Sequence, residues 1–193
     1  MRLKHVVVGV VLSGFVLVAP AAADADWIFT PFVGGNFGGD TVDTTVNFGG
    51  SLAYMGAGAV GFEVDFGYAP EFFGFDSDDI DSNVTTLMAN VIVGAPIGGT
   101  SGPGVRPYVS GGAGLLRTHV KDAGDLFDIS DNSFGFDVGG GAMIFLSDNV
   151  GIRGDIRYFR SLENEEDDDF DLPDLNLGEF DFWRGTVGVS FRF

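Results

Sequence analysis

An alternation of apolar residues with small or charged residues restricts the fold of this sequence more than any other feature. In residues 60–68 one set is Val60, Phe62, Val64, Phe66 and Tyr68, and the other is Gly61, Glu63, Asp65 and Gly67. Residues 150–158 and 183–193 repeat the pattern. A period of two gives a β-strand one apolar and one polar face. Because no segment of useful length has the period of an amphipathic helix, the pattern predicts an all-β chain.

Weaker alternation extends over the remaining sequence and predicts eight strands. Their ranges are about 27–37, 45–54, 58–68, 84–96, 105–118, 133–146, 150–160 and 182–193. An even number suits an antiparallel up-and-down barrel. Connections 38–44, 69–83, 119–132 and 161–181 are longer and acidic, whereas 55–57, 97–104 and 147–149 are mostly short. Because successive connections of a meander alternate between its ends, we expect acidic loops at one end.

The polar face is predicted to line the interior. The exterior of a soluble strand seldom needs glycine, whereas the narrow interior of an eight-stranded barrel accommodates it. Charges in a closed lumen are costly unless paired, so we expect a lumen charge network. Its predicted members are Glu63, Asp65, Arg106, Asp137, Arg153, Asp155, Arg157, Arg184 and Arg192. With the apolar face outward, the chain is predicted to be a transmembrane β-barrel. A soluble ligand-binding barrel is the alternative.

Two further features point to export and to a membrane. Arg2 and Lys4 precede an apolar run over residues 6–18 and an alanine-rich segment, which is the order of a secretory signal peptide. We therefore expect a signal peptide over residues 1–23, cleaved after Ala23 or Ala25, and a barrel domain over 24–193. Aromatic residues near the predicted strand ends suggest an interfacial girdle: Trp27, Tyr54, Tyr68, Tyr158 and Trp183.

The segment Arg106-Pro107-Tyr108-Val109-Ser110-Gly111-Gly112-Ala113-Gly114 and the chain end resemble the bacterial outer-membrane beta-barrel domain family. This family includes the outer membrane protein A barrel and the opacity-type proteins. The resemblance covers the whole mature chain and implies a location in the cell outer membrane. It also implies that the barrel-insertion machinery recognises a terminal signal formed by Val189, Phe191 and Phe193. Outer-membrane lipid and lipopolysaccharide are the other partners implied.

Several activities are excluded or disfavoured by the residues present. The 10 basic and 28 acidic residues give a net charge of −18, which excludes nucleic-acid binding by a basic surface. The chain has no cysteine for disulfides or metal. Residues 139–141 lack the rest of a phosphate-binding loop, and the carboxylate run 163–171 lacks the spacing of an EF-hand. We therefore predict no cofactor or metal site and interpret 163–171 as a solvated loop.

His119 is the single histidine of the predicted mature chain, and we expect it just past the fifth strand, near Asp122 and Asp125. The chain resembles small outer-membrane barrels, and some of these hydrolyse lipid A and carry a His-x-Ser-Asn motif. The sequence departs from that motif, because it reads His119-Val120-Lys121-Asp122. No catalytic residue is therefore predicted. We expect a monomeric, non-enzymatic barrel with a packed polar lumen and acidic extracellular loops, acting in envelope integrity or surface interaction. A small porin or channel is the alternative, followed by a lipid A-modifying enzyme.

Overall fold

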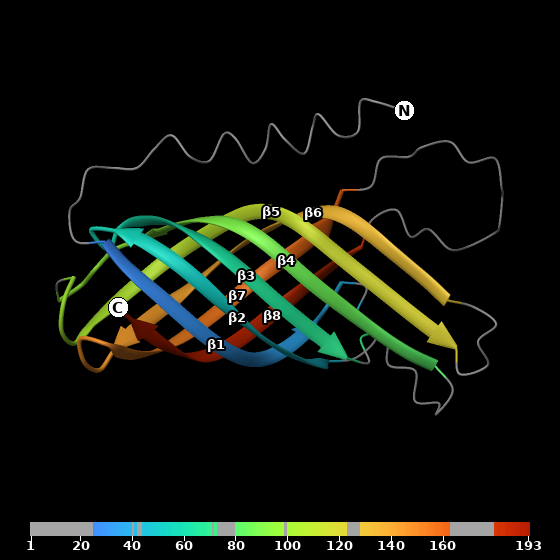
Figure 1. Ribbon diagram of the computed structural model, residues 1–193, viewed down its shortest axis with the longest axis horizontal. Helices are drawn as coiled ribbons and strands as arrows, with labels where there is room; N and C mark the ends of the chain where they lie inside the picture. Colours follow the sequence, from blue (N-terminus) through green and yellow to red (C-terminus); the bar gives the residue numbers. More distant parts are fainter. Residues whose placement is uncertain are drawn as a thin grey trace.

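The computed structural model describes residues 25–39, 41, 44–70, 72, 80–98, 100–122, 128–162 and 180–193. Its strands are β1 (Ala25–Phe37), β2 (Thr45–Gly56), β3 (Val60–Pro70), β4 (Ile80–Gly94), β5 (Gly104–Asp122), β6 (Asp128–Phe145), β7 (Val150–Ser161) and β8 (Asp181–Arg192). Each strand pairs antiparallel with its neighbours in sequence, and β1 also pairs with β8 (Figure 1). The predicted eight-stranded up-and-down barrel is confirmed.

The connections divide the barrel into two ends. Residues 57–59, 95–103 and 146–149 join strands at what we call the turn end, where β1 begins and β8 finishes (Figure 1). Connections 38–44, 71–79, 123–127 and 162–180 belong to the opposite loop end, and most of their residues lie outside those described. The predicted signal peptide over residues 1–23 also lies outside the described residues. Across the described ranges no helix is long and apolar enough to span a membrane.

Three strands continue beyond the barrel wall at the loop end. β4, β5 and β6 contain 15, 19 and 18 residues and project past their neighbours (Figure 1). The prediction of a loop over 119–132 was therefore wrong, because Lys121 still pairs with Asp128. Residues 80–83, also predicted as loop, belong to β4. Backbone pairing does not require apolar side chains, so the loss of hydrophobicity after residue 118 marks the edge of the apolar band, not the end of the strand.

The alternation places the apolar face outside, as predicted. On β3, Val64 is 53% exposed whereas Glu63 is 1% exposed, and β7 repeats this contrast with Ile152 outside and Arg153 inside. Exposed large apolar side chains occur on the outside of every strand. Such a continuous apolar exterior is stable in lipid and would aggregate in water. This arrangement contradicts the alternative of a soluble ligand-binding barrel.

Inward-facing glycines allow the strands to coil tightly. A Cβ atom at Gly34 would overlap the carbonyl oxygen of Gly185 on β8, and one at Gly114 would overlap the carbonyl oxygen of Leu87 on β4. Neighbouring backbones can approach this closely only where there is no side chain. The glycine-rich runs therefore contribute to closing a narrow barrel.

Candidate functional site

The lumen is organised in three layers along the barrel axis. An apolar cluster fills the turn end and consists of Ile28, Ala53, Met55, Ile92, Tyr108, Met143 and Phe145. A second fills the loop end and consists of Ala69, Phe72, Val84, Met88, Leu116, Phe159 and Phe182. Charged side chains lie between them. Sequence reasoning missed both apolar layers, although residues 84–93 give a signal, because apolar residues occur there on both faces of β4.

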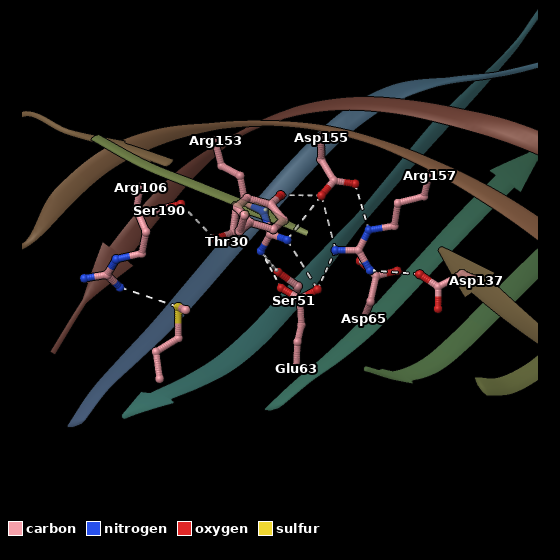
Figure 2. A network of polar contacts seen from close by, with 12 residues as sticks. Thr30, Ser51, Glu63, Asp65, Arg106, Asp137, Arg153, Asp155, Arg157 and Ser190 are labelled. Atoms are coloured by element: carbon pink, nitrogen blue, oxygen red, sulfur yellow. Dashed lines mark hydrogen bonds and ion pairs between the residues drawn. The ribbon is translucent and has the colours of Figure 1, made fainter. Parts of the chain in front are cut away.

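Glu63 lies at the centre of the charged layer. It projects from β3 toward two arginines of β7, on the opposite wall (Figure 2). Its Oε2 accepts a hydrogen bond from Nη1 of Arg153, and its Oε1 accepts one from Nη2 of Arg157 at 2.5 Å. All three side chains are almost fully buried. One carboxylate therefore ties two opposite walls of the barrel together.

Asp155 completes this central group by bridging the same two arginines. Nε of Arg157 donates to its Oδ1 at 2.7 Å, and Nη2 of Arg153 donates to its Oδ2 at 3.3 Å. The hydroxyl of Tyr108 donates to Asp155 and accepts a hydrogen bond from Nε of Arg153 at 2.6 Å. Two carboxylates and two guanidinium groups thus form an electrically neutral unit, as a buried charge cluster requires.

Arg184 extends the network toward the loop end. Its Nη2 donates to Oδ1 of Asp65 at 2.7 Å, while Asp137 accepts from Nη1 of Arg157 at 3.3 Å. The guanidinium group of Arg184 also lies over the rings of Phe32 and Phe159, 5.0 and 4.7 Å from their centroids. These cation–π contacts join the charged layer to the two neighbouring phenylalanine side chains.

The two remaining arginines of the predicted network lie apart from it at the turn end. Arg106 donates to Asp26 at 3.3 Å, a partner that sequence reasoning missed although Asp26 shares the inward face of β1. Arg192 donates to the carbonyl oxygens of Asp148 at 2.5 Å, Thr100 at 2.8 Å and Gly102 at 3.3 Å. Arg192 thus fastens the β4–β5 and β6–β7 turns to the last strand. The predicted set consists of one network of seven residues and two separate turn-end arginines.

One small cavity lies beside the network. A cavity of about 10 Å³ is lined by residues that include Thr30, Ser51 and Arg153, and this is about the volume that one water molecule needs. Within the described lumen, the side chains of Asn36, Asn47 and Asn90 contain buried polar atoms without a protein partner. The layer is therefore suited to holding the walls together, with room for isolated water molecules.

The other candidate residues are on the outside or in undescribed segments. His119 lies within β5, in register with Asn83 and Ser130, and not past the strand as expected. Residues 163–171 fall outside the described ranges. In the part of the chain that is described, no group of three His, Asp or Glu side chains could hold a metal ion.

The aromatic girdle residues lie at both ends of the apolar band. Trp27 packs against Tyr54 near the turn end, with ring centroids 5.1 Å apart. Tyr158 packs against Trp183 toward the loop end at 5.3 Å, and Tyr68 contacts a phenylalanine there. Two belts of amphipathic rings separated by apolar side chains are typical of proteins that cross a bilayer with strands.

Comparison with known proteins agrees with this geometry. The model of the outer membrane protein beta-barrel domain family matches residues 9–193. A 22 kDa outer membrane protein of Rhizobium leguminosarum bv. viciae is 29% identical over 171 residues, which is 82% of this chain and 72% of that protein. Similar solved structures are Neisserial surface protein A and the attachment invasion locus protein Ail of Yersinia pestis. Their TM-scores are 0.59 and 0.57 at 16% and 15% identity, each covering 88% of this chain and 98% of the other, and they show a shared fold.

Proposed function

The chain belongs to the outer membrane protein beta-barrel domain family and is located in the cell outer membrane, and on this premise we propose that it is a monomeric, non-enzymatic barrel without an open pore. Its role is envelope integrity or surface interaction, with acidic loops exposed on the cell surface. The lumen is the observation that supports this proposal most strongly.

Ion passage would require three separate barriers to open. The Glu63 carboxylate links Arg153 and Arg157 across the lumen, and an apolar cluster closes each end. Eight strands enclose an interior just wide enough for side chains, so a pore could form only by displacing them. A packed lumen argues for a structural role and against the alternative of a small channel.

Planar-bilayer recording of the purified protein tests this proposal. Refolded monomer, identified by its faster migration in unboiled detergent gels, should give a baseline no different from that of boiled protein. Stable conductance steps that increase in frequency with the folded fraction would contradict the proposal and favour a small channel. For the enzyme alternative, mass spectrometry of lipid A incubated with wild type and His119→Ala should show no deacylation by either protein.

The proposed orientation places the loop end outside the cell. The short turns lie at the turn end, together with the beginning of β1 and the last residue of β8. In barrels of this kind the end with short turns faces the periplasm, which supports this orientation. Protease added to intact cells should therefore cleave within 161–181. Protection of this segment until the cells are opened would reverse the orientation.

We also propose that the end of β8 carries the signal for barrel insertion. Val189, Phe191 and Phe193 all face outward and are exposed. An outward row of apolar side chains is accessible to the insertion machinery before the barrel is surrounded by lipid. Replacement of Phe193 by serine should reduce outer-membrane yield in cells while leaving refolding from urea into detergent unchanged.

A further inference from the structure

The basic residues are distributed unevenly between the lumen and the outer wall. Of the ten Lys and Arg residues in the sequence, Arg2 and Lys4 precede the barrel and five of the other eight face the lumen. The remaining three are Arg117, Lys121 and Arg160, and all lie in the loop-end parts of β5 and β7. Throughout the described outer wall, neither the turn end nor the apolar band carries a basic residue.

The outer wall over β4, β5 and β6 changes from apolar to polar at one level. The register aligns three exposed apolar side chains across these strands: Leu87, Leu115 and Phe134. Two residues nearer the loop end, the next outward-facing row is Thr85, Arg117 and Asn132. The boundary between lipid and water on this wall therefore lies between the two rows.

Arg117 is available for an external partner. It is exposed, and it forms no ion pair with any residue that the structure describes. Arg160 differs, because it is opposite Asp181 in the β7–β8 register. Directly paired residues on adjacent strands have Cβ atoms about 5 Å apart. The hydroxyl of Thr85 and the amide of Asn132 can therefore donate hydrogen bonds to a group held by the guanidinium of Arg117.

We propose that Thr85, Arg117 and Asn132 bind a phosphate of the lipid A moiety of lipopolysaccharide, an inference that rests on the proposed outward orientation of the loop end. A planar guanidinium group with neighbouring neutral donors suits a phosphate, which accepts several hydrogen bonds at once. Lipid phosphates lie just outside the apolar band, at the level of this row. The acyl chains of the same lipid would cover Leu87, Leu115 and Phe134.

The site also accounts for how so acidic a chain could hold an anionic lipid. The net charge of −18 opposes such binding at long range, but exposed charges are largely screened beyond about 8 Å at physiological salt. A single unpaired arginine in contact with the phosphate therefore outweighs carboxylates that lie farther away. The polar row provides this contact on one wall, so lipid A should bind there in preference to the rest of the perimeter.

A competition experiment with two forms of one lipid tests the site. Folded wild type is reconstituted in phosphatidylcholine vesicles that contain bisphosphorylated and dephosphorylated lipid A in equal amounts. The lipid A that stays bound through mild detergent extraction is quantified by mass spectrometry. Wild type should retain the phosphorylated form in excess, and Arg117→Gln should reduce the ratio about fivefold. Arg117→Lys, which keeps the charge but loses the planar fork, should retain part of the preference.

Arg160→Gln is the matched control, because it removes the same charge from the same end of the barrel and should leave the ratio unchanged. Faster migration of each unboiled variant in gels verifies that it is folded. A wild-type ratio of one would overturn the lipid site and leave the closed-barrel function intact. An equal fall in both variants would also overturn it, because it would show diffuse attraction instead of a site. Failure of the proposed function would be recognised separately, as conductance or as protection of the loop end on intact cells.

Discussion

Neutralising Glu63 should destabilise the barrel more than any comparable change at its ends. The substitution Glu63→Gln keeps the shape of the side chain and removes a charge that Arg153 and Arg157 share. The central group then holds two guanidinium charges against the single carboxylate of Asp155. Breaking a buried ion pair from one side costs about 3 to 5 kcal/mol, because it leaves an uncompensated charge.

Urea unfolding in detergent, followed by tryptophan fluorescence and by gel migration, measures this loss. With a slope of about 2 kcal/mol per molar urea, a cost of 4 kcal/mol shifts the unfolding midpoint by about 2 M. Asp26→Asn is the matched control. It also deprives a buried arginine of its carboxylate, but Asp26 is 19% exposed at the turn end and holds Arg106 through one bond. We expect it to cost about 1 to 2 kcal/mol.

A double variant separates charge imbalance from loss of packing. Glu63→Gln combined with Arg153→Met leaves Asp155 and Arg157 as a balanced pair, joined at 2.7 Å. Its unfolding free energy should exceed that of Glu63→Gln alone, although a second residue has been changed. A cost below about 1 kcal/mol for Glu63→Gln would refute the reasoning, since it would mean that water solvates the lumen charges. Strictly additive costs would refute it too.

Three further changes probe the wall and the turn end. Gly114→Ala drives a Cβ into a carbonyl oxygen of β4 and should cost about 1 to 3 kcal/mol in urea unfolding, whereas Gly154→Ala meets nothing within 4 Å and should be neutral. Val64→Arg puts a charge on the lipid face and should cost about 2 to 4 kcal/mol in lipid vesicles, and an unchanged midpoint would contradict the inside-out arrangement. Arg192→Met releases the carbonyl oxygens of two turns, so the backbone amides in 95–103 should exchange hydrogen faster than in wild type. Equal exchange rates in the variant and in wild type would show that Arg192 does not fasten these turns.

Much of the barrel wall could be predicted because the side-chain pattern of each strand depends on what that strand faces. Lipid requires apolar side chains at every second position, so Val64 and Phe66 indicate an outer face without reference to any other strand. This signal stops where lipid stops. The apolar alternation therefore predicts that β5 ends at residue 118, although the strand continues to Asp122 in register with β4 and β6.

The members of the lumen network were identifiable for a related reason. A charged residue inside the lipid-facing part of an alternating strand must face inward, which selects Glu63 and Arg153 without any knowledge of their contacts. The apolar layers at the two ends gave a weaker signal. Met88 and Ile92 belong to a strand that is apolar on both faces, and period alone does not distinguish a lipid-facing residue from one that fills a lumen.

Local periodicity and the length of each run are enough to predict the fold class, the number of strands and the face of each strand that meets lipid. Which charges meet depends on the closed barrel. Glu63 reaches Arg153 and Arg157, 90 and 94 positions away, because closure of β1 on β8 sets the stagger that brings β3 and β7 to the same height. That stagger belongs to the whole closed sheet. The same stagger places Arg117 beside Thr85 of β4 and Asn132 of β6 on the outer wall, with no carboxylate partner among the described residues. The sequence of one strand alone does not indicate this arrangement.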